Sequence, residues 1–442
     1  MKNTFYVSCP IDTFSGYGAR ARDFVKALIE LDEYDVRILP QRWGTTPTGF
    51  IESHEEKWGF LSSHITHQIP AQPDIWCQIT VPNEFQPMGK FNIGLTAGIE
   101  TNACAHTWIQ GMNKMDVILT SSVHSKNILS HSEFTTQDQK TKKEGPKLIL
   151  EKPIEVLIEG ADLETFKVVK NSELKLTSLK NYINNIPEKF AYLFVGTWIK
   201  GDMGHDRKNI GTLVKNFYEL FRGVKNKPAL ILKTSMASPT YMSRREVLRR
   251  LDDIKSQIPL SDKSEKEWPS IYLLNGNLND EEMNELYNHH KIKSMVCLTH
   301  GEGFGRPLLE FSLTGKPIIT TNWSGHIDFL QPKFTPLVNG ELKDLHESAV
   351  VDGMLIKGSK WFYPDENHSK FLLTDVLNNY KTYKEKSKKQ KHYSKENFSF
   401  EVMKHQISDI LKRYVPELPK KVELNLSGLG DIKIPKKEKV NG

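Results

Sequence analysis

Two carboxylates separated by a glycine-rich loop are the residues whose types and spacing best suggest chemistry. Glu302 and Glu310 lie eight positions apart, after an apolar run at 295–298 that is long enough for a buried strand. Pro307 suits the first turn of a helix, where its missing N–H costs nothing. The loop between them offers three residues that would lie against a ligand: Gly303, Phe304 and Gly305.

This strand, loop and helix predict a ligand that carries two kinds of group. The glycines let the backbone approach closely, and the N–H groups and dipole of a helix N-terminus favour an anion such as phosphate. Glu302 and Glu310 would repel phosphate, so we expect their partners to be hydroxyl groups. Sugars supply hydroxyls, and the stretch is therefore typical of a nucleotide-sugar site. The alternative is surface charge around an ordinary strand-to-helix turn.

Two basic residues lie at a predicted helix start, a position that is unfavourable for positive charge. Arg207 and Lys208 are adjacent and precede a predicted helix, although the helix dipole there prefers anions. Their position makes sense if a diphosphate lies between them, because fixed cations stabilise the charge that grows on a departing nucleoside diphosphate. Lys233 ends a predicted strand at 229–233 and points to the same cleft. A pair of solvated surface cations remains the alternative reading of Arg207 and Lys208.

These residues need two parallel sheets to position them. Apolar runs alternate with helical patterns along the whole chain, which predicts an α/β fold. At 442 residues, two domains are the natural expectation. We expect the following organisation: an N-terminal Rossmann-like acceptor domain at 1–170, a linker at 171–189, a C-terminal Rossmann-like nucleotide-sugar domain at 190–395, a crossover helix at 396–415 and an extended tail at 416–442.

The spacing of Glu302 and Glu310 resembles the E-x7-E motif of retaining GT-B glycosyltransferases of the family 4-like group. This resemblance implies GT-B architecture, with two Rossmann-like domains facing a cleft and a C-terminal helix that crosses back to the first domain. It further implies that Glu302 touches donor-sugar hydroxyls, that Glu310 binds the nucleotide ribose and that the anomeric configuration is retained. The family often has an arginine where Thr197 stands.

The loop after the first predicted strand contains Gly16, Tyr17 and Gly18. In the GT-B family this loop faces the donor phosphates, and we assign all three residues to donor binding on that basis. The same letters also match a dinucleotide-binding fingerprint, which leaves an oxidoreductase as an alternative. The context for the fingerprint is poorer, because Asp35 begins the next strand, whereas an acidic ribose ligand should end it.

Glu100 follows the predicted strand at 91–97, at the carboxyl end where α/β sites gather. We take Glu100 as a candidate acceptor-side carboxylate, together with Glu302, Arg207 and Lys208 as catalytic residues. A capping or structural role for Glu100 is the alternative.

Composition adds several expectations. The sequence has no D-x-D triplet of the kind that metal-dependent transferases use, so we expect no metal and no cofactor, with a UDP-sugar as the donor substrate. No run is long enough for a transmembrane helix. Four cysteines without a CxxC pair are typical of a reduced, cytoplasmic protein. The net charge of +6 permits a phosphate-rich partner without requiring one, and no obligate protein partner is evident.

The N-terminal run FYVSCPIDTFSGYGARARDF, with LPQRWG after it, resembles glycosyltransferases encoded by large tailed phages. Some of these transfer glucose or arabinose to hydroxymethylcytosine in DNA, which implies 5-hydroxymethylcytosine as the acceptor here. The lysine-rich insertion at 130–152 and the arginines between 244 and 250 would suit DNA, although a solvated helix face also explains the arginines. A base inside a duplex would have to be flipped out first. The alternative acceptor is a cell-surface glycan.

Overall fold

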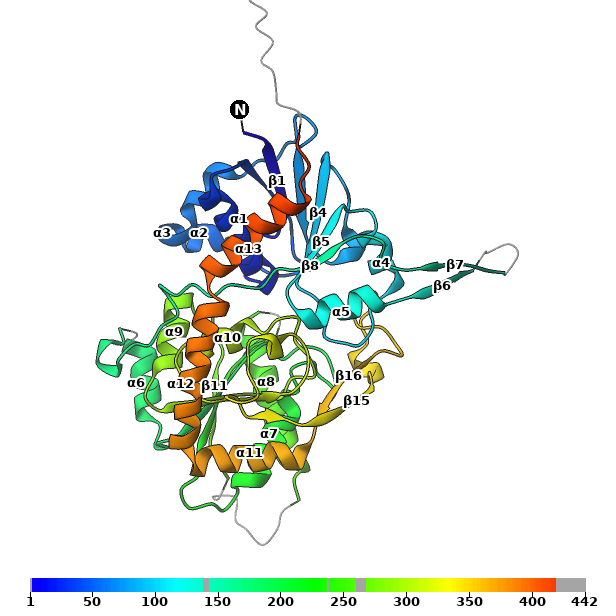
Figure 1. Cartoon of the computed structure of the whole chain (residues 1–442). Coiled ribbons are helices and arrows are strands. Elements are labelled where there is room, and N and C mark those ends of the chain that lie inside the picture. Colours follow the sequence, from blue (N-terminus) through cyan, green and yellow to red (C-terminus); the bar gives the residue numbers. More distant parts are fainter. Residues whose placement is uncertain (1, 138–142, 176, 237, 260–267, 419–442) are drawn as a thin grey trace, which may run out of the picture.

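The chain folds around two parallel six-stranded sheets, each in its own domain (Figure 1). The computed structural model describes residues 2–137, 143–175, 177–236, 238–259 and 268–418. The inner strands of both sheets are short, largely apolar and buried, as expected for parallel strands covered by helices on both faces, whereas the edge strands β2 (Asp35–Pro40) and β11 (Ile271–Leu274) are partly exposed. The predicted α/β architecture of two Rossmann-like domains is confirmed.

The first sheet has the strand order β2-β1-β3-β4-β5-β8. Its strands are β1 (Thr4–Cys9), β2 (Asp35–Pro40), β3 (Ile75–Ile79), β4 (Phe91–Thr96), β5 (Val117–Thr120) and β8 (Ile154–Val156). The helices of this domain are α1 (Gly16–Leu31), α2 (Phe50–Ser53), α3 (Glu55–Trp58), α4 (His106–Met112) and α5 (Val123–His131). Helix α1 begins with the cap that its sequence encodes, because the Ser15 hydroxyl accepts the N–H of Gly18 at 2.9 Å.

The second sheet has the order β11-β10-β9-β12-β13-β14. Its strands are β9 (Ala191–Val195), β10 (Ala229–Lys233), β11 (Ile271–Leu274), β12 (Ile292–Cys297), β13 (Ile318–Thr321) and β14 (Leu337–Val338). Its helices are α7 (Ile210–Phe221), α8 (Tyr241–Gln257), α9 (Asp280–Asn288), α10 (Arg306–Ser312), α11 (Glu366–Asn378) and α12 (Tyr380–Asn397). A side hairpin of β15 (Gly340–Asp344) and β16 (Lys360–Pro364) follows β14.

The C-terminal helix α13 (Phe400–Tyr414) returns from the second domain to the first, as predicted (Figure 1). The backbone of Ala161 is hydrogen-bonded to both sides of the turn before α13, at 2.9 Å to Phe398 and 2.8 Å to Phe400. Lys404 then pairs with Glu30 of α1 at 2.8 Å. The crossing ties the end of the chain to the domain that contains its beginning.

Two segments that have a polar sequence nevertheless form regular secondary structure. The region at 171–189 contains helix α6 (Thr177–Asn185), whose Ile183 is buried at 1% exposure. The lysine-rich region pairs as an antiparallel hairpin of β6 (Phe134–Gln137) and β7 (Glu144–Leu148), which projects from the first domain (Figure 1). Residues 138–142 of that region and residues 419–442 of the expected tail lie outside the described residues.

None of the described helices is both long enough and apolar enough to cross a membrane.

Candidate active site

Four charged side chains from both domains meet where the domains face each other. The Lys208 Nζ lies 2.6 Å from the Glu302 Oε1, and the Arg207 Nη1 lies 3.4 Å from the Glu302 Oε2. The same Arg207 nitrogen lies 3.2 Å from the Glu100 Oε1, so the guanidinium joins a carboxylate of each domain. The structure therefore brings together all four residues that the sequence assigned to catalysis.

Two loops of the second domain hold this cluster in place. Arg207 and Lys208 end the loop between β9 and α7, and Glu302 lies in the loop between β12 and α10. The Arg207 carbonyl accepts the N–H of His300 at 2.9 Å and the Thr299 hydroxyl at 3.1 Å. The two cations are therefore fixed to the loop that carries their carboxylate.

The charges of the cluster are set by burial and by their neighbours. Burial by itself would raise the pKa of Glu302, but Lys208 and Arg207 hold this pKa at about 2. Burial raises the pKa of Glu100, against the opposing effect of Arg207. Glu302 is thus ionised at neutral pH, and its charge is already neutralised by cations that a diphosphate would also attract.

The glycines of the loop serve a purpose that the sequence did not reveal. A Cβ on Gly303 would lie 2.2 Å from the Ala97 carbonyl oxygen, and one on Gly301 would lie 2.4 Å from the Glu100 carbonyl oxygen. Both atoms belong to the first domain, so these glycines let the loop pack against it. Gly305 adopts a left-handed φ of 98° before α10, a conformation that favours glycine.

Phe304 was predicted to bind the donor, but its ring is only 3% exposed. The ring packs 5.0 Å from that of Phe329, in the core between α10 and the start of α13. Its side chain therefore anchors the loop in the core.

Glu310 has partners that the sequence analysis missed. Its carboxylate accepts the Arg306 Nε at 3.0 Å and the Tyr287 hydroxyl at 3.2 Å. Arg306 also pairs with Asp23 of α1 and so links the two domains. Burial raises the pKa of Glu310 to about 7. The i, i+4 spacing of Arg306 and Glu310 was the available signal for their pairing, whereas nothing in the sequence pointed to Asp23.

The three N-terminal residues that were predicted to bind the donor have different surroundings. Gly16 is exposed, and a Cβ there would meet nothing within 4 Å. Gly18 instead packs against the Thr13 carbonyl, which a Cβ would approach to 2.4 Å. The Tyr17 hydroxyl accepts the N–H of Ala97 at 3.1 Å, and its ring stacks on Trp43 at 3.9 Å between centroids. Tyr17 thus positions the segment that precedes Glu100, and Gly16 alone of the three faces open space.

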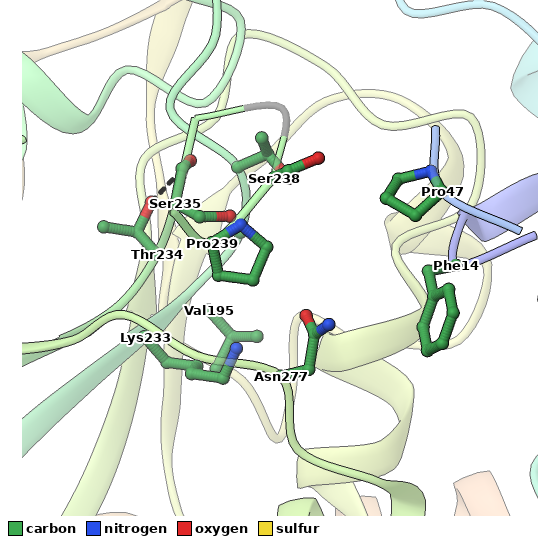
Figure 2. Close-up of a pocket in the computed structure, with 11 residues that line it drawn as sticks. Phe14, Pro47, Val195, Lys233, Thr234, Ser235, Ser238, Pro239 and Asn277 are labelled. Atoms are coloured by element: carbon green, nitrogen blue, oxygen red, sulfur yellow. Dashed lines mark hydrogen bonds between the residues drawn. The ribbon is translucent and has the colours of Figure 1, made fainter. Parts of the chain in front are cut away.

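A polar cavity of about 210 Å³ lies between the domains beside β9 and β10 (Figure 2). Its second-domain side includes Lys233, Thr234, Ser235, Ser238, Pro239 and Asn277; Phe14 and Pro47 come from the first domain. Burial lowers the pKa of Lys233, and among the described residues this amine has no hydrogen-bond or ion-pair partner. Most of the cavity's residues follow carboxyl ends of parallel strands, a position from which they could have been predicted.

The cavity lies next to the charged cluster and to a second cavity. Gly196 lines the first cavity, and a Cβ on it would lie 3.5 Å from the Lys208 Cδ. The second cavity, of about 430 Å³, shares Phe14 and Asn277 with the first. The two cavities thus adjoin each other at Phe14 and Asn277, and Lys208 lies beside the first.

Comparisons with known proteins give the fold. No family model matches the chain, and no curated protein matches it. Sucrose-phosphate synthase from Thermosynechococcus elongatus superposes with a TM-score of 0.59 at 12% identity, covering 93% of this chain and 99% of that one. HepE from Anabaena, in complex with UDP-glucose, gives 0.56 at 10% identity, covering 93% and 99%. The α,α-trehalose 6-phosphate synthase from Burkholderia multivorans gives 0.59 at 9% identity, again over 93% and 99%. The chain therefore has the GT-B fold of these glycosyltransferases.

Proposed function

We propose that the chain is a retaining, metal-independent glycosyltransferase that moves a sugar, of the glucose or arabinose class, from a UDP-sugar to a hydroxyl acceptor. The observation that carries this is the cluster of Glu302, Lys208, Arg207 and Glu100 between the domains. Structural neighbours support the donor class, because HepE is described in complex with UDP-glucose.

The residues suggest how the transfer would proceed. The donor nucleotide would lie in the polar cavity near Lys233, with its diphosphate toward Lys208 and Arg207. The bond between the anomeric carbon and the β-phosphate oxygen breaks, and the leaving UDP takes the electron pair. Lys208 and Arg207 stabilise the charge that develops there. Glu302, relieved of its cations, accepts hydrogen bonds from the sugar hydroxyls.

Retention follows if the acceptor hydroxyl attacks from the face that UDP leaves. The acceptor oxygen then forms the new bond to the anomeric carbon and gives its proton to the departing phosphate. Glu100 comes from the first domain and reaches Arg207, so it lies on the side expected for the acceptor. Contact between the domains at Gly301 and Gly303 would limit the access of water to the sugar.

For the acceptor, we propose 5-hydroxymethylcytosine in DNA. The phage-like N-terminal run and the basic charge of the chain support this assignment. A cell-surface glycan is the second candidate. Two neighbours, sucrose-phosphate synthase and α,α-trehalose 6-phosphate synthase, are named for carbohydrate products, which supports a carbohydrate acceptor.

A nucleotide-release screen tests both the proposed transfer reaction and the proposed acceptor. Several UDP-sugars are incubated with hydroxymethylated DNA, unmodified DNA and a panel of oligosaccharides, and the products are weighed by mass spectrometry. We expect UDP release with a mass gain only on hydroxymethylated DNA. The Glu302→Gln variant should lose transfer while keeping its fold. Transfer to an oligosaccharide alone would select the second candidate, and near-normal turnover by the variant would remove the assigned role of Glu302.

A further inference from the structure

Three arginines of this chain have no partner, and their positions are related. Arg42, Arg244 and Arg245 are exposed, and within the described part of the chain none of their side chains makes a hydrogen bond, an ion pair or a ring contact. Every other arginine has a carboxylate or carbonyl partner, as Arg249 has with Glu246 at 2.7 Å. Free guanidinium groups are thus the exception in this molecule.

The free arginines follow the walls of the first cavity on both domains. Ser238 and Pro239 form one wall, and helix α8 begins directly after them, with Arg244 and Arg245 in its first turns. Pro47 forms part of the opposite wall (Figure 2), and Arg42 lies earlier in the same loop, which follows β2. Unpaired arginines therefore lie on both domains, in segments that also contribute to the walls of this cavity.

Exposed apolar side chains accompany these charges. Tyr241 is 71% exposed and Met242 is 67% exposed, values unusual for such large side chains. Tyr241, Arg244 and Arg245 are three and four residues apart on α8 and so share one face of the helix. An exposed ring beside free cations is the combination with which proteins bind a single strand, because bases stack on the ring and phosphates pair with the cations.

The placement of Arg244 and Arg245 is unfavourable for the isolated helix. Cations near a helix N-terminus oppose the macrodipole, and the first turn of α8 has no acidic residue to compensate. Arg249 and Arg250, further along, are instead compensated by Glu246. An anionic partner at the N-terminal end of α8 would remove this electrostatic cost. Arg244 and Arg245 therefore differ from Arg249 and Arg250, although the two pairs look equivalent in the sequence.

We propose that Tyr241, Arg244 and Arg245, with Arg42 from the loop that carries Pro47, bind the sugar–phosphate backbone and one base of a nucleic acid acceptor. This inference rests on the proposed function, since it supplies that reaction with an acceptor surface. An acidic polysaccharide has comparable charge but no planar bases to stack on Tyr241. The exposed ring therefore favours a nucleic acid over such a glycan.

Binding of a fluorescently labelled single strand of roughly 12 nucleotides, followed by anisotropy, tests the surface directly. We expect Arg244→Ala/Arg245→Ala to weaken binding and to lower the slope of log K against log salt by about 1.4, or about 0.7 for each lost phosphate contact. The matched control Arg249→Ala, on the same helix, should leave affinity and slope unchanged. Tyr241→Ala should weaken binding about tenfold, and Tyr241→Phe should restore it. Thermal unfolding confirms that each variant is folded.

Three results would overturn the inference. The first is a double variant that binds with the affinity and salt slope of the unmodified chain. The second is an Arg249→Ala variant that loses as much affinity as the double variant is expected to lose. The third is binding of heparin that depends on both arginines but not on Tyr241, together with oligonucleotide binding that no variant changes. This third result would assign the surface to an acidic glycan.

A parallel measurement separates this inference from the proposed function. UDP release from UDP-sugars into water, without acceptor, is measured for the unmodified chain and for each variant. We expect the arginine variants to release UDP at the unmodified rate, because none of the substituted residues belongs to the charged cluster. If the unmodified chain releases no UDP under any condition while oligonucleotide binding still depends on these residues, the transferase proposal fails and the nucleic-acid surface remains.

Discussion

Replacing Lys208 with methionine isolates the central pair of the proposed site. The change removes the ammonium group that lies 2.6 Å from Glu302 and keeps a side chain of similar length and volume. Glu302 then keeps only Arg207, at 3.4 Å, as a cationic partner. Its side chain is 6% exposed, so water replaces little of what is lost.

The structure gives the size of the effect in two ways. A pKa of about 2 for Glu302, against an ordinary value of 4.5, corresponds to about 3 kcal/mol of favourable interaction with its surroundings. Breaking a buried ion pair by removing one partner costs about 3–5 kcal/mol. Since Arg207 remains, we expect Lys208→Met to lower the free energy of unfolding by about 2–3 kcal/mol at pH 7.

The pH dependence has a definite sign. Because the pKa of Glu302 is depressed in the folded chain, its contribution is complete above pH 4.5 and is lost as the pH falls toward about 2. The difference in stability between the unmodified chain and Lys208→Met should therefore shrink at acidic pH. Urea unfolding at pH 7 and at about pH 3 measures both values.

A double-mutant cycle with Glu302→Gln completes the test. The double variant carries neither charge, so we expect it to recover much of the stability that each single variant loses, with a coupling energy of about 2 kcal/mol. Losses that simply add would refute the interaction. A Lys208→Met enzyme that transfers sugar at the unmodified rate would refute its role at the leaving group, whatever its stability.

Three further perturbations test other parts of the site. Since burial raises the pKa of Glu310 to about 7, its contribution to stability should fall as the pH rises from about 4.5 through 7. Glu310→Gln should remove this loss, so the urea midpoint of the variant should change less between pH 5 and pH 8 than that of the unmodified chain. Lys233→Ala should weaken UDP binding about tenfold in calorimetry with the fold unchanged, because it removes an unpaired cation from the cavity. Asp23→Asn should loosen the domain contact made by Arg306 and increase the radius of gyration in X-ray scattering, and an unchanged radius would show that other contacts keep the domains together.

The sequence predicted the architecture well because its signals are local. Apolar runs that are buried on both faces mark parallel strands, and Ser15, Asn279 and Gly305 mark where helices begin. The pairing of Glu302 with Lys208 was also within reach, since both follow carboxyl ends of neighbouring strands in one sheet. What the sequence analysis read as a polar linker is partly helix α6, because a single buried stripe that includes Ile183 is enough to fold it against the domain.

Contacts between the domains could not be predicted in the same way. Gly303 looks like a ligand-binding glycine, yet it packs against the Ala97 carbonyl of the first domain. Gly18 looks similar, but it packs against the Thr13 carbonyl within its own domain. Tyr17 and Phe304 are likewise used to position loops. Arg306 joins Asp23 across 283 positions, a distance at which no periodicity or spacing applies. Gly303, Arg306 and Asp23 are determined by how the surfaces of the two domains meet.

The charges of the site explain why the diphosphate and the sugar of one donor would be recognised together. Glu302 and Glu100 face Arg207 and Lys208, so the cluster is close to neutral before any ligand binds. A diphosphate must compete with Glu302 for Lys208, and its binding leaves that carboxylate without a partner unless hydroxyl groups take its place. A donor that carries both diphosphate and sugar meets both demands, whereas UDP alone meets only one. Lys233 adds a positive charge that no carboxylate among the described residues neutralises, and under the proposed function it would favour binding of the diphosphate.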